Sequence, residues 1–332
     1  MNPPRVTEND LISFLMATPK VCSATEAQRV QPPRFQAPAH DAFTRLLTRL
    51  EPDATSLWEE VRPLVVRHQG VLVIDDSTLD KPSARQMELV GYHWSGKHHR
   101  VVKGINLISL IWTDGDRMYP CDYRVYDAND GLTKNDHAQA MLEEAQKRGF
   151  QPKYVLFDSW YASVENLKCV RAKGWKFLTR MKVNRKVRID RGTPIAVAKA
   201  PISAEGTLVW LPEFGEAKVF RVVTPDGDTQ HWLTNDLDLS ALDRIGVADL
   251  AWNVEEYHRG IKQYCGVERC QCLSAKAQRN YIRASLRVFV RLEWRRFSTG
   301  FSWFETKVSI IRKAVCEYLR KPLFDLPNFA TA

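Results

Sequence analysis

The sequence predicts an α/β protein in which helices flank a mixed β-sheet with a β-rich insertion, and a small helical unit forms the N-terminus. Short apolar segments rich in β-branched residues, such as residues 71–74, alternate with amphipathic helical segments through the middle of the chain. Strand patterns precede the first of these helices, which favours a sheet of mixed direction. Residues 183–235 instead carry closely spaced strand patterns separated by turn residues.

The composition indicates one large domain and a smaller one, since 44% of the 332 residues are hydrophobic. No apolar stretch approaches the roughly 20 residues of a membrane-spanning helix, and residues 1–10 lack the apolar region of a signal peptide. The seven scattered cysteines fit reduced thiols. We therefore expect a cytoplasmic protein with no membrane partner. Its formal net charge of +9 favours an acidic polymer as partner, nucleic acid first.

Residues 1–66 are expected to form the small helical unit. Residues 41–50 and 57–68 carry apolar side chains at helical spacing, and a proline-rich loop at residues 29–41 precedes them. This unit is either a cap on the larger domain or a unit that binds DNA ends.

Residues 67–182 are expected to form the first part of the main domain. Three strand patterns come first, at residues 71–75, 101–115 and 117–127. Pro120 marks an edge or a bend in the third, because proline cannot donate to a β-ladder. A helix, a short strand, a second helix and a further strand follow, at residues 133–150, 153–163, 164–175 and 176–182. Thr133 can cap the first helix and Gly149 can end it.

Residues 183–235 form the predicted insertion, and residues 236–332 are expected to complete the main domain with helices. The helical pattern resumes near Asp249. Arginine recurs at every fourth position within residues 279–295, which on a helix makes a slanting stripe. That stripe is either a DNA-contacting surface or a solvated face.

Two predicted strands that lie far apart in the sequence both end in aspartate. Residues 71–74 lead into Asp75 and Asp76, and residues 154–157 lead into Asp158. Ligands bind at strand ends in α/β sheets, and neighbouring strands would bring these carboxylates together. Carboxylates at one spot repel each other and need a cation, and hard oxygen ligands suit Mg²⁺ or Mn²⁺. The alternative is that each aspartate only caps a turn.

The best candidate for a third acid is Glu255. On a helix, Glu255, His258, Arg259 and Lys262 share one face, at positions i, i+3, i+4 and i+7. A carboxylate, an imidazole and two cations there suit metal and phosphate. Two divalent ions about 3.5–4 Å apart can activate a hydroxyl and stabilise the leaving oxygen in phosphodiester displacement.

These spaced motifs resemble the DDE transposases of bacterial insertion sequences, in the branch with a β-strand insertion before the last acid. The matching stretches are residues 73–82, 92–115, 130–138, 148–168 and 252–272. The resemblance implies an RNase H-like catalytic domain that cleaves DNA at the terminal inverted repeats of an element and transfers strands into target DNA. It implies two Mg²⁺ ions, with Mn²⁺ as substitute, and a bacterial protein associated with the nucleoid.

The resemblance assigns the catalytic and metal-binding roles to Asp76, Asp158 and Glu255. It also matches Lys262 to the family's basic residue on the same helix face. Asp75 is a rival for the first acid, because consecutive strand side chains face opposite ways and only one can point inward. The family pattern places the acid directly before a Ser/Thr pair, which favours Asp76. Glu256 is a weaker rival for Glu255.

One departure from the family concerns the residues before Glu255. The family usually carries a tyrosine seven residues and an arginine four residues before the glutamate, where this chain has Ala248 and Ala251. Either Arg244 or Arg259 substitutes, or this copy binds DNA without cutting it. A structure-specific RNase H-like nuclease is a further alternative.

Several residues are expected to contact DNA. Basic residues crowd the stretch after the second-acid helix, namely Lys176, Arg180, Lys182, Arg185, Lys186 and Arg188. They either track the phosphate backbone or protect a solvated edge strand. Trp94 could stack on an unpaired base near a cleaved end, and His258, Arg259 and Lys262 complete the set. Because transposition joins two ends, we expect a dimer on paired DNA ends.

Overall fold

The architecture is described from a computed structural model, which describes residues 5–32, 37–190 and 192–322. Residues 33–36 of the proline-rich loop lie outside the described residues. In that part of the chain, nine strands form one sheet in the order β2-β3-β1-β5-β6-β11-β10-β9, with β4 also paired to β3. Their bounds are β1 Val71–Asp80, β2 Gly91–Ser95, β3 Arg100–Thr113, β4 Met118–Val125, β5 Tyr154–Phe157, β6 Phe177–Met181, β9 Thr207–Leu211, β10 Gly215–Val223 and β11 Thr229–Thr234.

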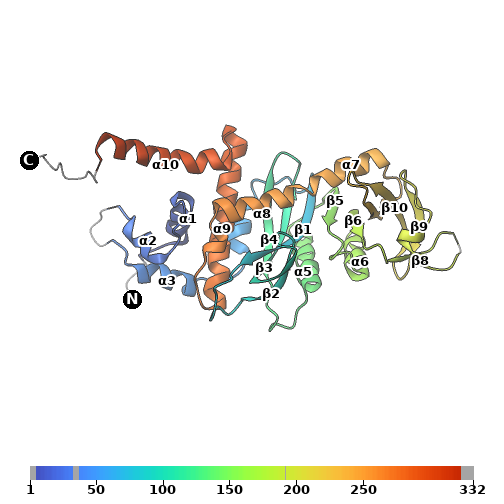
Figure 1. The fold of residues 1–332 in the computed structure, drawn as a ribbon, viewed down its shortest axis with the longest axis horizontal. Helices are drawn as coiled ribbons and strands as arrows, with labels where there is room; N and C mark the ends of the chain where they lie inside the picture. Colours follow the sequence, from blue (N-terminus) through green and yellow to red (C-terminus); the bar gives the residue numbers. More distant parts are fainter. Residues whose placement is uncertain (1–4, 33–36, 191, 323–332) are drawn as a thin grey trace, which may run out of the picture.

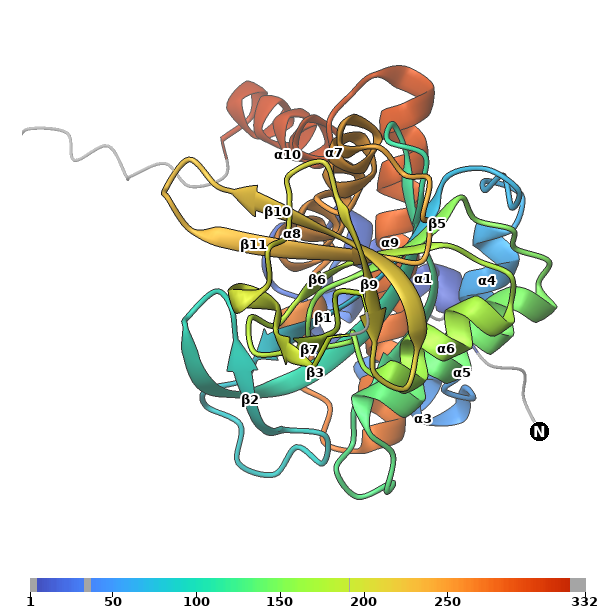
Figure 2. The same ribbon diagram turned by 90° about the vertical axis from the view of Figure 1, so that its right-hand side faces the viewer.

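The sheet is of mixed direction, as the sequence predicts. Strands β1, β5 and β6 run parallel, whereas β3 pairs with β1 and β11 pairs with β6 in antiparallel fashion. Thus the strands of the predicted insertion continue the main sheet through β11 (Figure 2). A small second sheet is made of β7 Lys186–Val187 and β8 Ile195–Ala196. At Pro120 the β3–β4 register shifts, so the proline sits at a bulge in an edge strand.

Helices cover both faces of the sheet (Figure 1). The helices are α1 Glu8–Ala17, α2 Ala24–Arg29, α3 His40–Arg49, α4 Thr55–Val61, α5 Lys134–Lys147, α6 Val164–Ala172, α7 Ala241–Leu250, α8 Asn253–Tyr264, α9 Ala275–Thr299 and α10 Trp303–Arg320, with short 3₁₀ turns at Val197–Lys199 and Val267–Arg269. Thr133 caps α5 with a reciprocal capping box, and Gly149 follows its end with a φ of 79°. None of the helices in the described ranges is long and apolar enough to cross a membrane.

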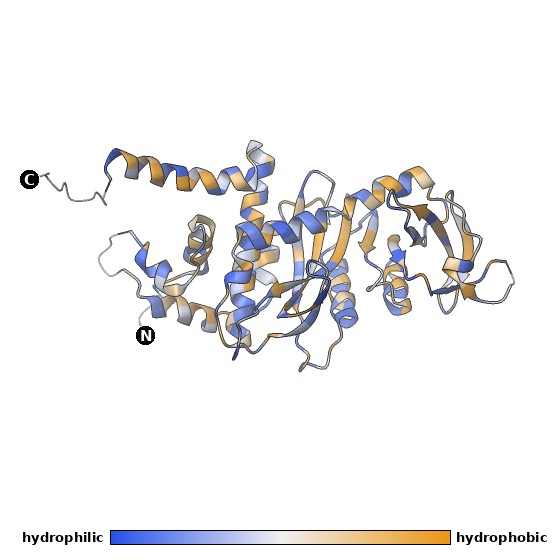
Figure 3. Cartoon of the chain, viewed as in Figure 1, coloured by the Kyte–Doolittle hydropathy of each residue, from blue (hydrophilic) through white to orange (hydrophobic). Residues whose placement is uncertain are grey.

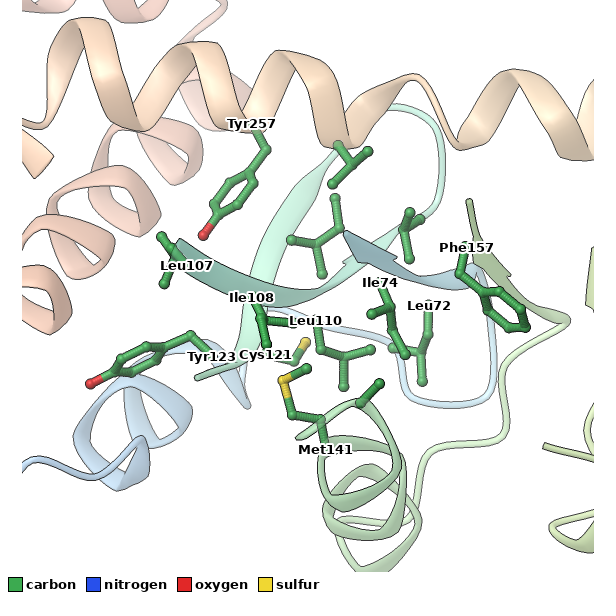
Figure 4. Packing of buried hydrophobic residues seen from close by; sticks show 14 of the residues in the cluster. Leu72, Ile74, Leu107, Ile108, Leu110, Cys121, Tyr123, Met141, Phe157 and Tyr257 are labelled. Carbon is green, nitrogen blue, oxygen red and sulfur yellow. The ribbon is translucent and has the colours of Figure 1, made fainter. Parts of the chain in front are cut away.

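The core lies between the sheet and these helices, where the strands are strongly apolar (Figure 3). Tyr257 of α8 points to one face of the sheet, and Met141 of α5 packs on the other (Figure 4). Leu72 and Ile74 of β1 point to the α5 side. The hydroxyls of Tyr257 and Ser109 of β3 lie 3.2 Å apart, which ties α8 to the opposite side.

The arginine stripe on α9 is neither solvated nor available to DNA along most of its length. Arg287 donates to Glu8 at 2.7 Å and to Glu60 at 2.6 Å, and the side chain of Arg283 is only 4% exposed. These carboxylates belong to the N-terminal helical unit, which packs on α9. The stripe therefore fastens that unit to the main domain, which supports the interpretation of the unit as a cap.

Helix α7 begins earlier than the sequence analysis predicts. It starts at Ala241 rather than near Asp249, and Ser240 caps it by accepting a hydrogen bond from the Asp243 backbone at 3.0 Å. It ends at Leu250, and a short break at residues 251–252 separates it from α8.

Candidate active site

Strands β1 and β5 bring Asp75 and Asp158 to one level of the sheet. Ile74 is paired with Phe157, the last residue of β5. The next residues are therefore Asp75 on one strand and Asp158 on the other. The expectation that the two aspartate-bearing strands are neighbours is confirmed, but the expected end of the first strand at Asp75 is wrong. Strand β1 continues to Asp80, because residues 75–80 pair with β3.

Asp75 and Asp76 point to opposite faces of the sheet, as strand geometry requires. Asp75 faces α8, where its Oδ2 lies 3.7 Å from Nδ1 of His258. Asp76 faces α5, on the same side as Ile74, and its Oδ2 lies 2.8 Å from Nζ of Lys134.

Asp76 is held by three donors. Lys134 and the Asn106 amide, at 2.6 Å, donate to Oδ2, and the Tyr161 hydroxyl donates to Oδ1 at 2.8 Å. Burial opposes the charge, but the Lys134 ammonium and these hydrogen bonds together lower the pKa of Asp76 below its ordinary value. A set made only of donors matches an ionised carboxylate.

The other carboxyl groups show the opposite effect. Burial, followed by the charges of Asp76, Asp158 and Glu255, raises the pKa of Asp75 well above its ordinary value. Asp158 is exposed at the rim, yet desolvation by the surrounding protein and the charge of Asp76 raise its pKa too. Backbone N–H groups of Trp160 and Tyr161 donate to Asp158 Oδ1 at 2.9 and 3.3 Å. The four acids therefore share one electrostatic environment.

This cluster suits a hard cation by its chemistry, although its ligands are not fully assembled. Within the described ranges, no three His, Cys, Asp or Glu side chains stand in a metal-holding arrangement. The atoms that these acids offer to a metal are nevertheless all carboxylate oxygens. The pKa values of Asp75 and Asp158 are raised in part because of neighbouring negative charge. A divalent cation would relieve that repulsion.

The predicted functional face of α8 is divided between the interior and the surface. His258 is buried, and burial together with the Lys262 charge lowers its pKa to about 3, so the ring is neutral and has no direct access to DNA. Lys262 donates to the Thr78 carbonyl at 3.0 Å. Arg259 is exposed, 3.5 Å from Glu256. Only Arg259 of these three basic residues lies open to a ligand.

Of the two expected substitutes for the missing arginine at position 251, Arg259 is exposed, whereas Arg244 is not open to DNA. Arg244 is buried and packs on the Trp232 ring, 5.8 Å from its centroid. Arg180 lies on the strand opposite Trp232, 5.4 Å from the same ring, and its charge acts to lower the pKa of Asp158. Arg180 is therefore a cation that acts on the acidic cluster.

The predicted basic stretch forms an exposed surface with one recessed member. Arg180, Lys182 and Lys186 are exposed, whereas Arg185 is half-buried and donates to the Ala162 carbonyl. A groove of about 330 Å³ runs beside them, lined in part by Lys182, Arg185 and Lys186. Trp94 is 63% exposed on β2, at the far edge of the sheet.

Sequence reasoning missed four residues of the site, namely Asn106, Lys134, Trp160 and Tyr161. Lys134 follows the helix cap Thr133, so its place in the first turn of α5 could be predicted from the sequence. Its contact with Asp76 could not, because the two residues lie 58 positions apart in the chain. Trp160 and Tyr161 follow Asp158 in a tight turn. That turn puts the Trp160 ring near Lys134 and Lys182, at 5.8 and 5.2 Å.

Comparisons with known proteins show the family of the chain. The family model described as DDE superfamily endonuclease matches residues 21–215, more than half of the chain. The matched range includes Asp75, Asp76 and Asp158 and ends before Glu255. No curated protein matches the sequence.

The solved structures that match the chain include two transposase complexes. One is a piggyBac transposase synaptic complex with hairpin DNA, with a TM-score of 0.52, 12% identity and coverage of 97% of this chain and 72% of that one. This likeness confirms the predicted RNase H-like fold class. A Drosophila P element transposase strand transfer complex matches with a TM-score of 0.29, 11% identity and coverage of 98% and 76%, too weakly to support an argument.

Proposed function

The chain belongs to the DDE superfamily of endonucleases, and on that premise we propose that it is a transposase that cuts the ends of an insertion sequence and joins them to target DNA. The observation that carries this proposal is the electrostatically coupled group of four carboxylates at the end of β5 and the adjoining middle of β1. The net charge of +9 and the exposed cations beside this group suit double-stranded DNA.

We assign metal binding to Asp76, Asp158 and Glu255. Endonucleases of this superfamily generally use divalent metal ions. Bound at these carboxylates, Mg²⁺ (or Mn²⁺) would supply Lewis-acid activation of the attacking hydroxyl and of the leaving oxygen. Lys134, Asn106 and Tyr161 orient Asp76 and hold its carboxylate.

Asp76 is preferred to Asp75 as the first ligand because of its surroundings. Its three donors fix a carboxylate, whereas Asp75 accepts a backbone hydrogen bond from Asp76 at 2.8 Å and faces a neutral, buried His258. Asp75 lies in the middle of β1 and fills the space under α8.

The exposed cations position the DNA. Arg180, Lys182, Lys186 and Arg259 bind backbone phosphates, and Arg180 takes the part of the arginine that position 251 lacks. Terminal inverted repeats and target DNA are the partners, and two protomers hold paired ends. This arrangement fits a bacterial insertion sequence.

Cleavage of a duplex that carries the flanking inverted repeat tests the proposal. The wild type should cut at the repeat boundary with Mg²⁺ or Mn²⁺ and not with EDTA. Asp158→Asn and Glu255→Gln should fall to the EDTA level while repeat binding persists. Glu256→Gln, on the same helix but without a part in the cluster, is the matched control and should cut normally. Wild-type rates in Asp158→Asn would overturn the site assignment.

Ala248 and Ala251 favour a second candidate, a copy that binds its repeats without cutting them. That candidate predicts specific binding by gel shift and no nick in Mn²⁺. Substitution of Ala251 by arginine should then restore cutting.

A further inference from the structure

Trp160 stands out because a large aromatic side chain is left exposed beside the acidic cluster. Its exposed fraction is 56%, and it follows Asp158 by two residues. The backbone N–H of Trp160 donates to Asp158 Oδ1 at 2.9 Å, so the same turn fixes the acid and the start of the tryptophan side chain. The ring therefore lies at a defined place relative to Asp158.

Two lysines hold ammonium groups against this ring. Nζ of Lys134 lies 5.8 Å and Nζ of Lys182 lies 5.2 Å from the ring centroid, both within cation–π range. Lys134 also lies 2.8 Å from Asp76 Oδ2. A single lysine thus links the ring to a carboxylate of the site, which places the indole directly beside the reacting phosphate in the proposed function.

Neither Trp232 nor Trp94 offers this combination. Trp232 lies close to Arg180 and Arg244 but is only 9% exposed. Trp94 is exposed on β2, but it lies on the far side of β3 from the acid-bearing β1 strand. An exposed ring flanked by cations is the surface on which a nucleobase stacks while its phosphates meet the ammonium groups. Apolar packing gives no reason for Trp160, since more than half of it faces solvent.

We propose that Trp160, with Lys134 and Lys182, binds an unstacked nucleobase next to the scissile phosphate. This inference rests on the proposed function for the position of the phosphate. It transfers the base-stacking role that the sequence suggests for Trp94 to Trp160. The ligand is a base of either strand that leaves the duplex at the cleavage point, and recognition is by stacking, so it tolerates different bases.

A double-mutant cycle, which combines Trp160 variants with the removal of single DNA bases, tests this inference. Trp160→Ala, Trp160→Phe and the exposed control Trp294→Ala are assayed on duplexes with one abasic position, moved stepwise across the cleavage point. Every non-proline substitution keeps the backbone N–H that binds Asp158. On intact DNA, Trp160→Ala should lose roughly 5- to 150-fold in cleavage rate, the range expected for one stacked base, and Trp160→Phe should retain most of it.

The decisive result is the dependence on abasic position. At one position the wild type and Trp160→Ala should become equal, because no base is left to stack, while the defect persists at all others. A defect of equal size on every duplex, or no defect, would overturn the inference. The binding affinity of the same duplexes is also measured in EDTA. The coupling between the Trp160 substitution and the abasic position can then be measured even if the wild type does not cut. Absence of cutting together with coupled binding would contradict the proposed function and support this inference.

Discussion

Replacing Lys134 by methionine removes an ammonium group that lies 2.8 Å from Asp76 Oδ2 while keeping most of the side-chain volume. Both side chains are largely buried, with exposed fractions of 20% and 17%. A hydrogen bond to a charged group contributes about 1.5–3 kcal/mol, and solvent screens this pair little. Asn106 and Tyr161 still donate to Asp76. We therefore expect Lys134→Met to lower the free energy of unfolding by about 1.5–3 kcal/mol at pH 7.

The pH dependence separates this effect from lost packing. The folded-state pKa of Asp76 lies below its ordinary value of 3.8, so the stabilisation is complete above that value and is lost as the pH falls through the folded pKa. The assay is urea unfolding in EDTA between pH 3 and pH 8, with Lys182→Met as control. The deficit of Lys134→Met should shrink at the acidic end. A deficit of the same size at every pH would refute the reasoning, because it would then come from packing.

Three further predictions concern other parts of the molecule. Asp75→Asn should raise the melting temperature at pH 7, and this gain should vanish near pH 3. The reason is that the pKa of Asp75 is raised in the folded state, so its ionisation above pH 3.8 destabilises the fold. An unchanged melting temperature at both pH values would contradict this. Arg287→Met should lower the free energy of unfolding by about 1.5–3 kcal/mol in urea titrations, because it removes charge-assisted hydrogen bonds to Glu8 and Glu60, which keep only Arg283 and Arg291 as partners; a change below the error of the titration would mean that the N-terminal unit is held otherwise. Arg180→Gln should reduce the slope of the logarithm of DNA affinity against the logarithm of salt concentration by about 0.9, the contribution of one phosphate contact. Arg244 is buried, so Arg244→Gln should leave that slope unchanged. Equal slopes for Arg180→Gln and the wild type would mean that Arg180 does not contact DNA phosphate.

The apolar runs that lead into the site could be predicted because their signals are local, whereas the continuation of β1 to Asp80 depends on its pairing with β3. Val71–Ile74 and Tyr154–Phe157 are short apolar runs, and each leads directly into an aspartate. The period of two along a strand also gave opposite directions for Asp75 and Asp76. Which of them faces α8 depends on which helix covers which face, and that is a property of the whole sheet.

Helix α7 began earlier than predicted because it has almost no buried apolar stripe. Leu242 and Ile245 are 77% and 46% exposed, and Arg244 is the buried residue of this helix. Periodicity of apolar residues indicates a helix only when one face is packed. The cap at Ser240 was the remaining local signal.

The ion pairs of α9 could not be read from the sequence for a different reason. Arg287 binds Glu60 and Glu8, which lie 227 and 279 residues away along the chain. The stripe alone suits DNA, solvent or buried partners equally well. His258 shows the same difficulty: the helix face that carries Glu255 turns partly into the sheet, so the imidazole is buried rather than presented to DNA.

Strand transfer is the measurement that tests the central claim most directly. A duplex pre-cut at the terminal repeat, with a free 3′-OH, is incubated with plasmid target, Mg²⁺ and the wild type, Glu255→Gln or Glu256→Gln. The account predicts joined products with the wild type and Glu256→Gln and none with Glu255→Gln. Cleavage of branched or unrelated DNA without any joined product would contradict it and indicate a structure-specific nuclease.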